Sequence, residues 1–599
     1  MSQPPNTFLS TDNVQRAYNQ QRSFAFLWTF TKSKRSIIYC ALAALFVGSL
    51  VGVYSSRFLG TLVEDGLVHR NWAVVRKLGF GILLLEVFSL ALSFFGRTWL
   101  AVGALESVYQ IRRTLFDHLQ NLPIRYFDRQ PLGRTVTRLT YDVESLEDFF
   151  QGTFSRMIQA TFILISVFIA MIVTRPAFGL AIAATALPAI FATVYYRKPI
   201  LHWNRELSKR GSAINAKLSE FINGLPVIRS FGLESWSQNK FDAKIVDQLD
   251  AGLQTNYINA VSRPITLFFS TFPILFIILW GGSLVEKGLM SLGLFVTYVR
   301  YSERFSRPIF MLAQEIHQIQ TAMASAERVT TFLNEDVEAI TFKKVDSPTR
   351  LSKVQGDIEF EGVGMTYDGA KMVLSDVNFK IQAGSVVGLA GETGSGKTST
   401  VSLLSRLYPY QKGFIRIDGV AIEDMDRHWL RSQIGFVSQD VVIFKGSIRE
   451  NLRMGYDVED SQLIAAAQKT GLWQRLRDTG RGLDNLIYTN GTNLSAGEIQ
   501  LISLTRILIS NPAILIMDEA TANIDPELEH LIHEAVHEVF RGRTCLLIAH
   551  RLSTLKNCDR ILVFRQGNLA EEGSHQELVH QGGYYASLVK KGESIGAPA

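Results

Sequence analysis

The N-terminal half of the chain contains apolar runs that are each long enough to cross a lipid bilayer. The first run extends from Ile37 to Ser56 and holds about twenty residues without a charge, which is the length that one helical crossing requires. Comparable runs follow, and together they predict six membrane-spanning helices; the other five lie at about residues 78–101, 156–174, 178–196, 265–285 and 289–311. The sequence therefore predicts an all-α membrane domain with six transmembrane helices over residues 36–320.

Lysine and arginine residues are concentrated in two long segments between the predicted spans, residues 102–150 and 197–262. The short connections between the other spans carry few positive charges. Because positive residues are retained on the cytoplasmic side, we expect the N-terminus, both long segments and the C-terminal part to be cytoplasmic. Both segments have helical periodicity, which predicts helices that leave the bilayer and turn back near residues 131–133 and 211–217.

The segment that precedes the first span, residues 1–35, is polar and lacks the pattern of a cleavable signal. It contains the aromatic run from Phe24 to Phe30, followed by Lys32 and Lys34. Aromatic and basic residues in this order favour an interfacial elbow helix that lies on the membrane, and a mobile tail is the alternative.

Composition excludes several classes of protein. The net charge is +6, and the sequence has no dense basic stripe with interleaved aromatic residues, so nucleic-acid binding is not indicated. The three cysteines, Cys40, Cys545 and Cys558, form neither a disulfide framework nor a metal-ligand spacing, and we expect them to be unpaired packing residues.

After about residue 320 the sequence changes to the alternating pattern of a soluble α/β domain. Residues 321–355 form the predicted linker, which still begins as helix around Ala326–Val329. The soluble domain is expected over residues 356–590, and a short tail over 591–599.

A phosphate-binding loop lies in this domain, between the apolar run 386–390 and a predicted helix over 399–407. Glycines at the required spacing let the backbone wrap around phosphate oxygens, and the helix N-terminus adds its dipole. Lys397 supplies a positive charge to the outer phosphates, and the Thr398 hydroxyl is placed to bind Mg²⁺. The loop predicts ATP and Mg²⁺ as cofactors, held by Gly391, Glu392, Thr393, Gly394, Ser395, Gly396, Lys397, Thr398 and Ser399.

An acidic pair, Asp518 and Glu519, follows a second buried strand at 513–517. An aspartate at such a strand end can hold Mg²⁺, and the following glutamate can orient the attacking water in phosphoryl transfer. We therefore predict a catalytic role for Glu519.

Three further residues are candidates for the same site. His550 ends a third strand and is expected to contact the terminal phosphate, although a structural loop histidine is the alternative. Gln439 follows a strand at 434–438, and its amide is expected to reach both Mg²⁺ and the water. Tyr367 precedes the loop and is expected to stack on adenine, with simple packing as the alternative.

A helix that extends to about Ile509 begins with the segment Leu494-Ser495-Ala496-Gly497-Glu498. Ser495 is a favourable N-cap, and the small Gly497 leaves room for a ligand at the positive helix end. Ser495 and Gly497 are therefore predicted nucleotide contacts.

These motifs, in this order, resemble the nucleotide-binding domain of ATP-binding cassette (ABC) transporters over residues 356–590. Residues 20–330 resemble the six-helix exporter-type membrane domain, on the segments Phe127–Gly133, Arg138–Asp142 and Gly224–Phe231. The resemblance implies a half-transporter that binds two ATP molecules between two copies of the cassette. It also implies that 494–498 and Asp525 face the partner.

The segment 494–498 departs from the Leu-Ser-Gly-Gly-Gln signature of the family. Ala496 adds a methyl group, Glu498 places a carboxylate near a polyanion, and Ile499 and Leu501 lack the usual positive charges. Glu519 and His550 are nevertheless present. This combination favours a heterodimer with one degenerate ATP site, in which the partner supplies a regular signature; a homodimer with a tolerant signature is the alternative.

Charged residues within the predicted spans are the candidates for cargo contact. Such charges are costly in a bilayer and usually face a cavity, and the arginines of the sixth span are spaced four and three apart on one helical face. An anionic or amphiphilic cargo is expected, such as a lipid, glycolipid, drug or peptide. Pairing of the charges with one another is the competing interpretation. The candidates are Arg300, Glu303, Arg304, Arg307 and Glu86.

The sequence thus predicts a multi-domain fold: the membrane domain followed by an α/β P-loop NTPase. The predicted function is ATP-driven export by alternating access, in a bacterial inner membrane and in contact with membrane lipids. A homodimeric flippase and an ATP-gated membrane regulator remain alternatives, whereas the membrane spans argue against a soluble cassette ATPase.

Overall fold

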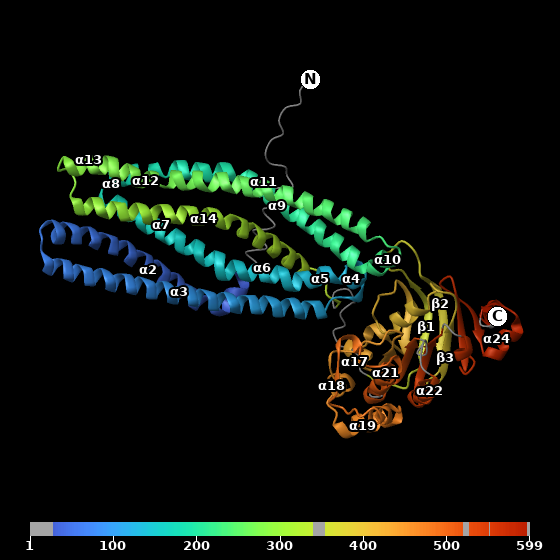
Figure 1. The fold of residues 1–599 in the computed structure, drawn as a ribbon. Helices are drawn as coiled ribbons and strands as arrows, with labels where there is room; N and C mark the ends of the chain where they lie inside the picture. Colours follow the sequence, from blue (N-terminus) through green and yellow to red (C-terminus); the bar gives the residue numbers. More distant parts are fainter. Residues whose placement is uncertain (1–27, 339–350, 352–353, 519–525, 550–551, 596–599) are drawn as a thin grey trace. The chain divides into compact units, whose positions relative to one another are not determined.

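The computed structural model describes residues 28–338, 351, 354–518, 526–549 and 552–595. Among them, contacts divide the chain into two compact units (Figure 1). The first unit contains the residues up to Gln120 together with Leu132–Glu335, and the second contains Asn121–Pro131 together with the residues from Asp336 onwards. Each unit is described separately.

Every element that the structure describes in the first unit is helical. Four helices are very long: α3 (Trp72–Gln120), α9 (Leu187–Asn223), α11 (Glu234–Ser270) and α14 (Leu292–Leu333). The others are η1 (Trp28–Lys34), α2 (Arg35–Thr61), η2 (Leu62–Val68), α5 (Leu132–Thr137), η3 (Arg138–Asp142), α6 (Val143–Asp148), η4 (Phe149–Thr153), α7 (Phe154–Thr174), α8 (Pro176–Thr185), α10 (Leu225–Ser230), α12 (Phe272–Phe276), η5 (Ile277–Gly281) and α13 (Gly282–Glu286).

The helices exceed the thickness of a bilayer, as the sequence predicts. At 1.5 Å per residue, α3 is about 74 Å long, whereas the hydrocarbon layer is about 30 Å thick. Within the described residues, five helical stretches are long and apolar enough to cross a membrane; they begin at Arg35, Trp72, Leu132, Pro176 and Glu234. The helix α14 is not among them, since it carries charged residues such as Arg300, Glu303 and Arg304. The sixth membrane span therefore stays a prediction.

The second reversal of the chain lies later than the sequence predicts. The helix α9 continues without interruption through residues 211–217 and ends at Asn223. The chain then turns through α10, which carries Pro226 in its first turn, and through Gly232 at a φ of +61°. The expected turn at 211–217 is wrong because its residues support a helix, and the proline and glycine further on interrupt it.

At the N-terminus, the expected interfacial helix lies partly outside the described residues. Its described portion, η1, is a 3-10 helix that leads directly into α2. Its position on a membrane surface stays a prediction.

The second unit is built around a six-stranded sheet with the strand order β12-β11-β3-β10-β9-β6. All neighbouring pairs are parallel except β11 and β12. Its strands are β3 (Val386–Ala390), β6 (Ile434–Val437), β9 (Ile514–Asp518), β10 (Thr544–Ile548), β11 (Arg560–Arg565) and β12 (Asn568–Gly573). A four-stranded antiparallel sheet in the order β2-β1-β4-β5 and a small β7–β8 pair complete the strands: β1 (Ile358–Met365), β2 (Leu374–Ile381), β4 (Lys412–Ile417), β5 (Val420–Ala421), β7 (Gly446–Ser447) and β8 (Leu486–Ile487).

Helices flank these sheets (Figure 1), and the buried apolar residues form two clusters. Alternate residues of β10 enter different apolar clusters, with Leu547 in one and Leu546 and Ile548 in the other. A central parallel strand is buried on both faces, which explains why the sequence reads as an uninterrupted apolar run. The helices are α4 (Ile124–Arg129), α16 (Lys397–Leu404), η6 (Ile422–Asp424), α17 (Arg427–Ser432), α18 (Ile448–Arg453), α19 (Asp460–Lys469), α20 (Leu472–Asp478), η7 (Thr489–Gly491), α21 (Ala496–Ser510), α22 (Pro526–Phe540), α23 (Leu552–Leu555), α24 (His575–Gln581) and α25 (Tyr584–Ile595).

The three cysteines are unpaired, as expected, but the packing role is confirmed only for the buried Cys545 and Cys558, since Cys40 is exposed. Burial raises the pKa values of Cys545 and Cys558 to about 12, so neither thiol ionises at neutral pH.

The buried carboxylate of Glu338 connects the segment that follows α14 to helix α17 of the second unit. Glu338 is 7% exposed, and its carboxylate lies 2.5 Å from Arg431 and 3.4 Å from Arg427, both in α17. Its backbone N–H also donates to the carbonyl oxygen of Asn121 at 2.7 Å. The segment Asn121–Pro131 and the junction after α14 are thus held together within one unit.

In the first unit, an ion pair fastens the end of α14 to η3. Asp142 is 1% exposed, and it accepts hydrogen bonds from Arg328 at 2.5 Å and from Ser325 at 3.1 Å.

We predict that Asp142→Asn destabilises the chain by about 1–2 kcal/mol, because Arg328 loses its charged acceptor but is itself half exposed. Thermal unfolding of the purified chain measures the effect. Glu144→Gln, two residues away and exposed, is the control; equal melting temperatures for the two variants would contradict the prediction.

Candidate functional site

The phosphate-binding loop lies between the end of β3 and the start of α16, as the sequence predicts. Its glycines Gly391, Gly394 and Gly396 have φ values of +144°, +81° and +111°. A Cβ atom at Gly391 would collide with the carbonyl oxygen of Phe564, so only glycine fits there. The loop therefore turns tightly into α16, whose first backbone amides have no acceptor within the helix.

Two buried side chains point their polar atoms into the loop region. Lys397 is 5% exposed, and its ammonium donates to the carbonyl oxygens of Gly391 at 2.7 Å and Glu392 at 3.0 Å. Burial lowers the pKa of Lys397, and the negative charge of Asp518 opposes this shift. The Ser395 hydroxyl is buried and makes no hydrogen bond with the residues that the structure describes. A buried cation and an unsatisfied hydroxyl fit the oxygens of a phosphate group.

The candidate magnesium ligands gather at one edge of the sheet. Asp518 ends β9, which pairs with β10 at Ile548, and β10 in turn pairs with the end of β3. Gln439 follows β6, the other neighbour of β9, and its side chain is exposed, as is that of Thr398. Carboxyl ends of parallel strands meet at a common edge, where α/β sheets bind ligands. Oxygen donors of these types suit Mg²⁺, which would neutralise phosphate charge when bound.

Three predicted functional residues, Glu519, Asp525 and His550, lie outside the described residues. Their roles stay predictions.

Tyr367 lies beside the helix that follows the loop. Its hydroxyl is 3.0 Å from the Ser399 hydroxyl, and its ring packs edge-on against Tyr408 with centroids 4.9 Å apart. Tyr408 in turn donates to Asp128 of α4 at 2.5 Å, and burial together with this carboxylate raises the pKa of Tyr408. The Tyr367 ring lines an open cleft of about 400 Å³, so a face remains available for a base. Stacking on adenine stays a prediction.

The segment that begins α21 differs from the sequence-based expectation. Ser495 is the N-cap, as predicted, and it forms a capping box with Glu498, whose carboxylate accepts from the Ser495 N–H at 2.9 Å. Glu498 is only 3% exposed, and its oxygens lie 3.3 Å from Arg481 and 3.6 Å from Arg475. The expected carboxylate facing a polyanion is therefore wrong. Glu498 points inward and is neutralised by two arginines. The spacing of these residues in the sequence does not predict the two ion pairs.

The other small and apolar residues of this segment divide between surface and core. Gly497 is buried, and a Cβ there would lie 3.0 Å from the side chain of Leu528, so its small size serves packing against α22. Leu501 is fully buried as well. Ala496 and Ser495 remain exposed at the helix end.

Most of the candidate cargo charges in the first unit are paired with one another. Arg304 donates to Glu86 at 2.8 Å, and the Ser55 hydroxyl donates to the same oxygen at 2.9 Å. Arg300 pairs with Glu303 at 3.1 Å. The competing interpretation, pairing within the protein, thus describes four of the five cargo candidates, whereas Arg307 is exposed and makes no ion pair within the described residues. Cargo contact by any of them stays a prediction.

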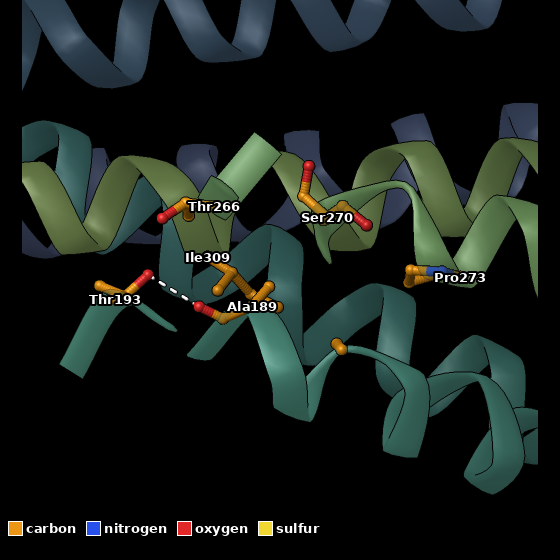
Figure 2. Close-up of a pocket in the computed structure, with 8 residues that line it drawn as sticks. Ala189, Thr193, Thr266, Ser270, Pro273 and Ile309 are labelled. Atoms are coloured by element: carbon orange, nitrogen blue, oxygen red, sulfur yellow. Dashed lines mark hydrogen bonds between the residues drawn. The ribbon is translucent and has the colours of Figure 1, made fainter. Parts of the chain in front are cut away.

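A cavity lined by residues of α9, α11, α12 and α14 is too small for cargo. Figure 2 shows it, with Thr193 donating to the carbonyl oxygen of Ala189 at 2.9 Å, and Thr266 and Ser270 nearby. Its volume of about 10 Å³ has room for roughly one water molecule.

The role of Glu498 leads to a prediction about stability. We expect Glu498→Ala to destabilise the chain by about 1–3 kcal/mol, because the Ser495 N–H and two guanidinium groups lose their acceptor. Chemical denaturation of the purified chain measures this loss. Glu577→Ala is the matched control, since Glu577 forms the same capping box with Ser574 but is exposed. If both variants unfolded at the same denaturant concentration, the arginine pairs would contribute nothing.

Comparisons with known proteins match both units. Residues 37–309 match the model of the ABC transporter transmembrane region, and residues 374–522 match that of the ABC transporter. The chain is 33% identical over 585 residues, 97% of its length and 96% of the relative, to an uncharacterized ABC transporter ATP-binding protein, YknV, of Bacillus subtilis.

Two other relatives have more specific names. A probable multidrug resistance ABC transporter ATP-binding/permease protein, YheH, of Bacillus subtilis is 32% identical over 525 residues, covering 85% of this chain and 76% of the relative. A fatty acid ABC transporter ATP-binding/permease protein of Mycobacterium bovis is 30% identical over 491 residues, covering 81% of this chain and 76% of the relative.

Proposed function

This chain belongs to the ABC transporter family and is an ATP-hydrolysing membrane transporter, and we propose that it exports an amphiphilic cargo by alternating access. The observation that supports this most strongly is the combination in one chain of the loop around Lys397 and Ser395 with a unit of long apolar helices. The loop suits the binding of nucleotide phosphates, and the long apolar helices suit the movement of a molecule through a bilayer.

In the proposed mechanism, each residue of the nucleotide site has one role. The amides that begin α16 and the ammonium of Lys397 hold the phosphates. Thr398, Gln439 and Asp518 would hold Mg²⁺, which would neutralise phosphate charge, and Glu519 would orient the attacking water. Tyr367 stacks on the base.

The path of the chain suggests how nucleotide binding reaches the membrane helices. The segment Asn121–Pro131 connects α3 to α5, yet it belongs to the unit that contains the phosphate-binding loop. Its Asp128 bonds to Tyr408, whose ring contacts Tyr367. A movement of Tyr367 on nucleotide binding would therefore be transmitted to the ends of both helices.

The names of two relatives are consistent with an amphiphilic cargo. One is a probable multidrug resistance transporter and the other a fatty acid transporter. We propose a lipid-like molecule with an acidic head group, since the membrane helices carry several arginines.

We further propose that the functional form is a dimer with a different half-transporter. Ala496 supports this proposal, because its methyl group is exposed at the helix end that the family turns toward the partner's nucleotide. Glu498 points inward and pairs with Arg481, so its carboxylate does not support a weakened signature. A homodimer is the alternative.

The central prediction concerns turnover. Glu519→Gln is expected to lower ATP hydrolysis by about 10²-fold or more, the usual contribution of a general base, and to abolish ATP-dependent accumulation of a labelled fatty acid in inverted vesicles. Lys397→Ala is expected to lose ATP binding, whereas Lys412→Ala, at an exposed lysine of β4, should behave like the parent. Accumulation that persisted in Glu519→Gln would support the ATP-gated alternative instead.

The dimer proposal has its own test. Expressed alone and purified, the chain is expected to show weak self-association and low ATPase activity, because its own signature carries Ala496. Ala496→Gly is expected to raise the ATPase activity of the isolated chain several-fold. Size-exclusion chromatography with light scattering and an ATPase assay measure both quantities. A tight homodimer with rapid hydrolysis in the parent chain would refute heterodimer formation.

A further inference from the structure

An open apolar cleft of about 430 Å³ lies in the first unit, apart from the cavity of Figure 2. Its walls come from α2, α3, α7 and α14, and aliphatic side chains dominate them. Representative residues are Leu50 and Val53 of α2, Leu85 of α3, and Ile169 and Val173 of α7. The volume is large enough for a long-chain molecule and contrasts with the single-water cavity described above.

The two main walls are continuous helix faces. On α2 the lining residues recur at positions 50, 53, 54 and 57, and on α7 at 166, 169, 170 and 173. This i, i+3, i+4, i+7 spacing places each set on one face, so the cleft runs along both helices for about two turns, or roughly 10 Å. Val173 is 74% exposed and Tyr54 is 53% exposed, so the cleft opens on the side of the unit that no described residue covers.

One cation lies at the end of this apolar cleft. Arg57 of α2 lines it and makes no ion pair with the residues that the structure describes. The nearby acidic side chains have other partners: Glu86 accepts from Arg304 and Ser55, and Glu64 accepts from the Gly293 N–H at 2.8 Å. Arg57 therefore has no ion-pair partner among the described residues, in contrast to Arg304.

Arg57 also lies at a suitable depth. It is 22 residues beyond Arg35, the first residue of α2, which corresponds to about 33 Å of helix. A hydrocarbon layer is about 30 Å thick, so Arg57 reaches the opposite interface while Leu50 lies deeper.

We propose that this cleft binds a single-chain amphiphile with a carboxylate head group. The alkyl chain lies along the faces of α2 and α7, and the carboxylate is held by the guanidinium of Arg57. Guanidinium groups bind carboxylates through two parallel hydrogen bonds, and removal from water strengthens these bonds. The cleft suits the apolar part of such a molecule and the cation suits its acidic end.

The proposal specifies a cargo site for the exporter and in that respect rests on the proposed function. Binding itself requires neither ATP nor a partner's signature. Binding and transport measured on the parent chain therefore separate the two: a parent chain that binds the acid without nucleotide but does not accumulate it with ATP would refute the export proposal alone.

The test uses a 16-carbon fatty acid that carries a photoreactive diazirine near its methyl end, and its methyl ester as the neutral analogue. The full-length chain in lipid nanodiscs is irradiated, and the labelled peptides are identified by mass spectrometry. We expect the acid to label the peptides that contain 50–57 and 166–174. We expect Arg57→Gln to reduce this labelling at least 10-fold and Arg57→Lys to retain most of it. Ile169→Trp, which fills the apolar part, should reduce it too.

The controls separate head-group recognition from ordinary lipid contact. Arg76→Gln removes an exposed arginine near the start of α3, outside the cleft, and should leave labelling unchanged. The ester should label the parent chain weakly and be insensitive to Arg57→Gln. Equal labelling by the acid in the parent and Arg57→Gln, or equal labelling of the parent by acid and ester, would show a lipid-filled groove without carboxylate recognition and would overturn the proposal.

Discussion

A charge that leaves water must find a compensating partner, and this constraint organises both units of the protein. Asp142 is almost completely buried and is held by Arg328, and Glu498 is held by Arg475 and Arg481. In the membrane unit, Arg304 and Glu86 neutralise each other. Each of these pairs joins residues from separate segments of the sequence, and the pairing compensates for the removal of both charges from water.

Compensation is incomplete at the positions for which we propose a function. The Ser395 hydroxyl is buried without a partner among the described residues, and Lys397 has only backbone carbonyl oxygens as acceptors. Arg57 has no acidic partner within the described residues. A phosphate group would satisfy the first two, and a carboxylate would satisfy the third.

Much of the second unit could be predicted from sequence, because its signals are local. The run 386–390 followed by the glycine-rich loop predicts a strand, a turn and a helix, and β3 and α16 have that order. Ser495 predicts an N-cap, and it is one. The long helices that extend beyond the predicted spans were also predictable from their periodicity. The second turn was not, since Gly211 is tolerated within α9 and the chain reverses only after Gly224.

The sequence by itself determined that the chain has apolar helices long enough for a bilayer and a loop shaped for phosphate, since both properties depend on residues adjacent in the chain. Only the tertiary structure decided where Glu498 points, which side chain packs against Gly497, and that Arg57 lines an apolar cleft without an ion pair among the described residues. These outcomes depend on contacts with Arg481, with Leu528 and with the residues around Arg57. Such contacts form only when separate helices pack, because charge compensation and packing act through space rather than along the chain.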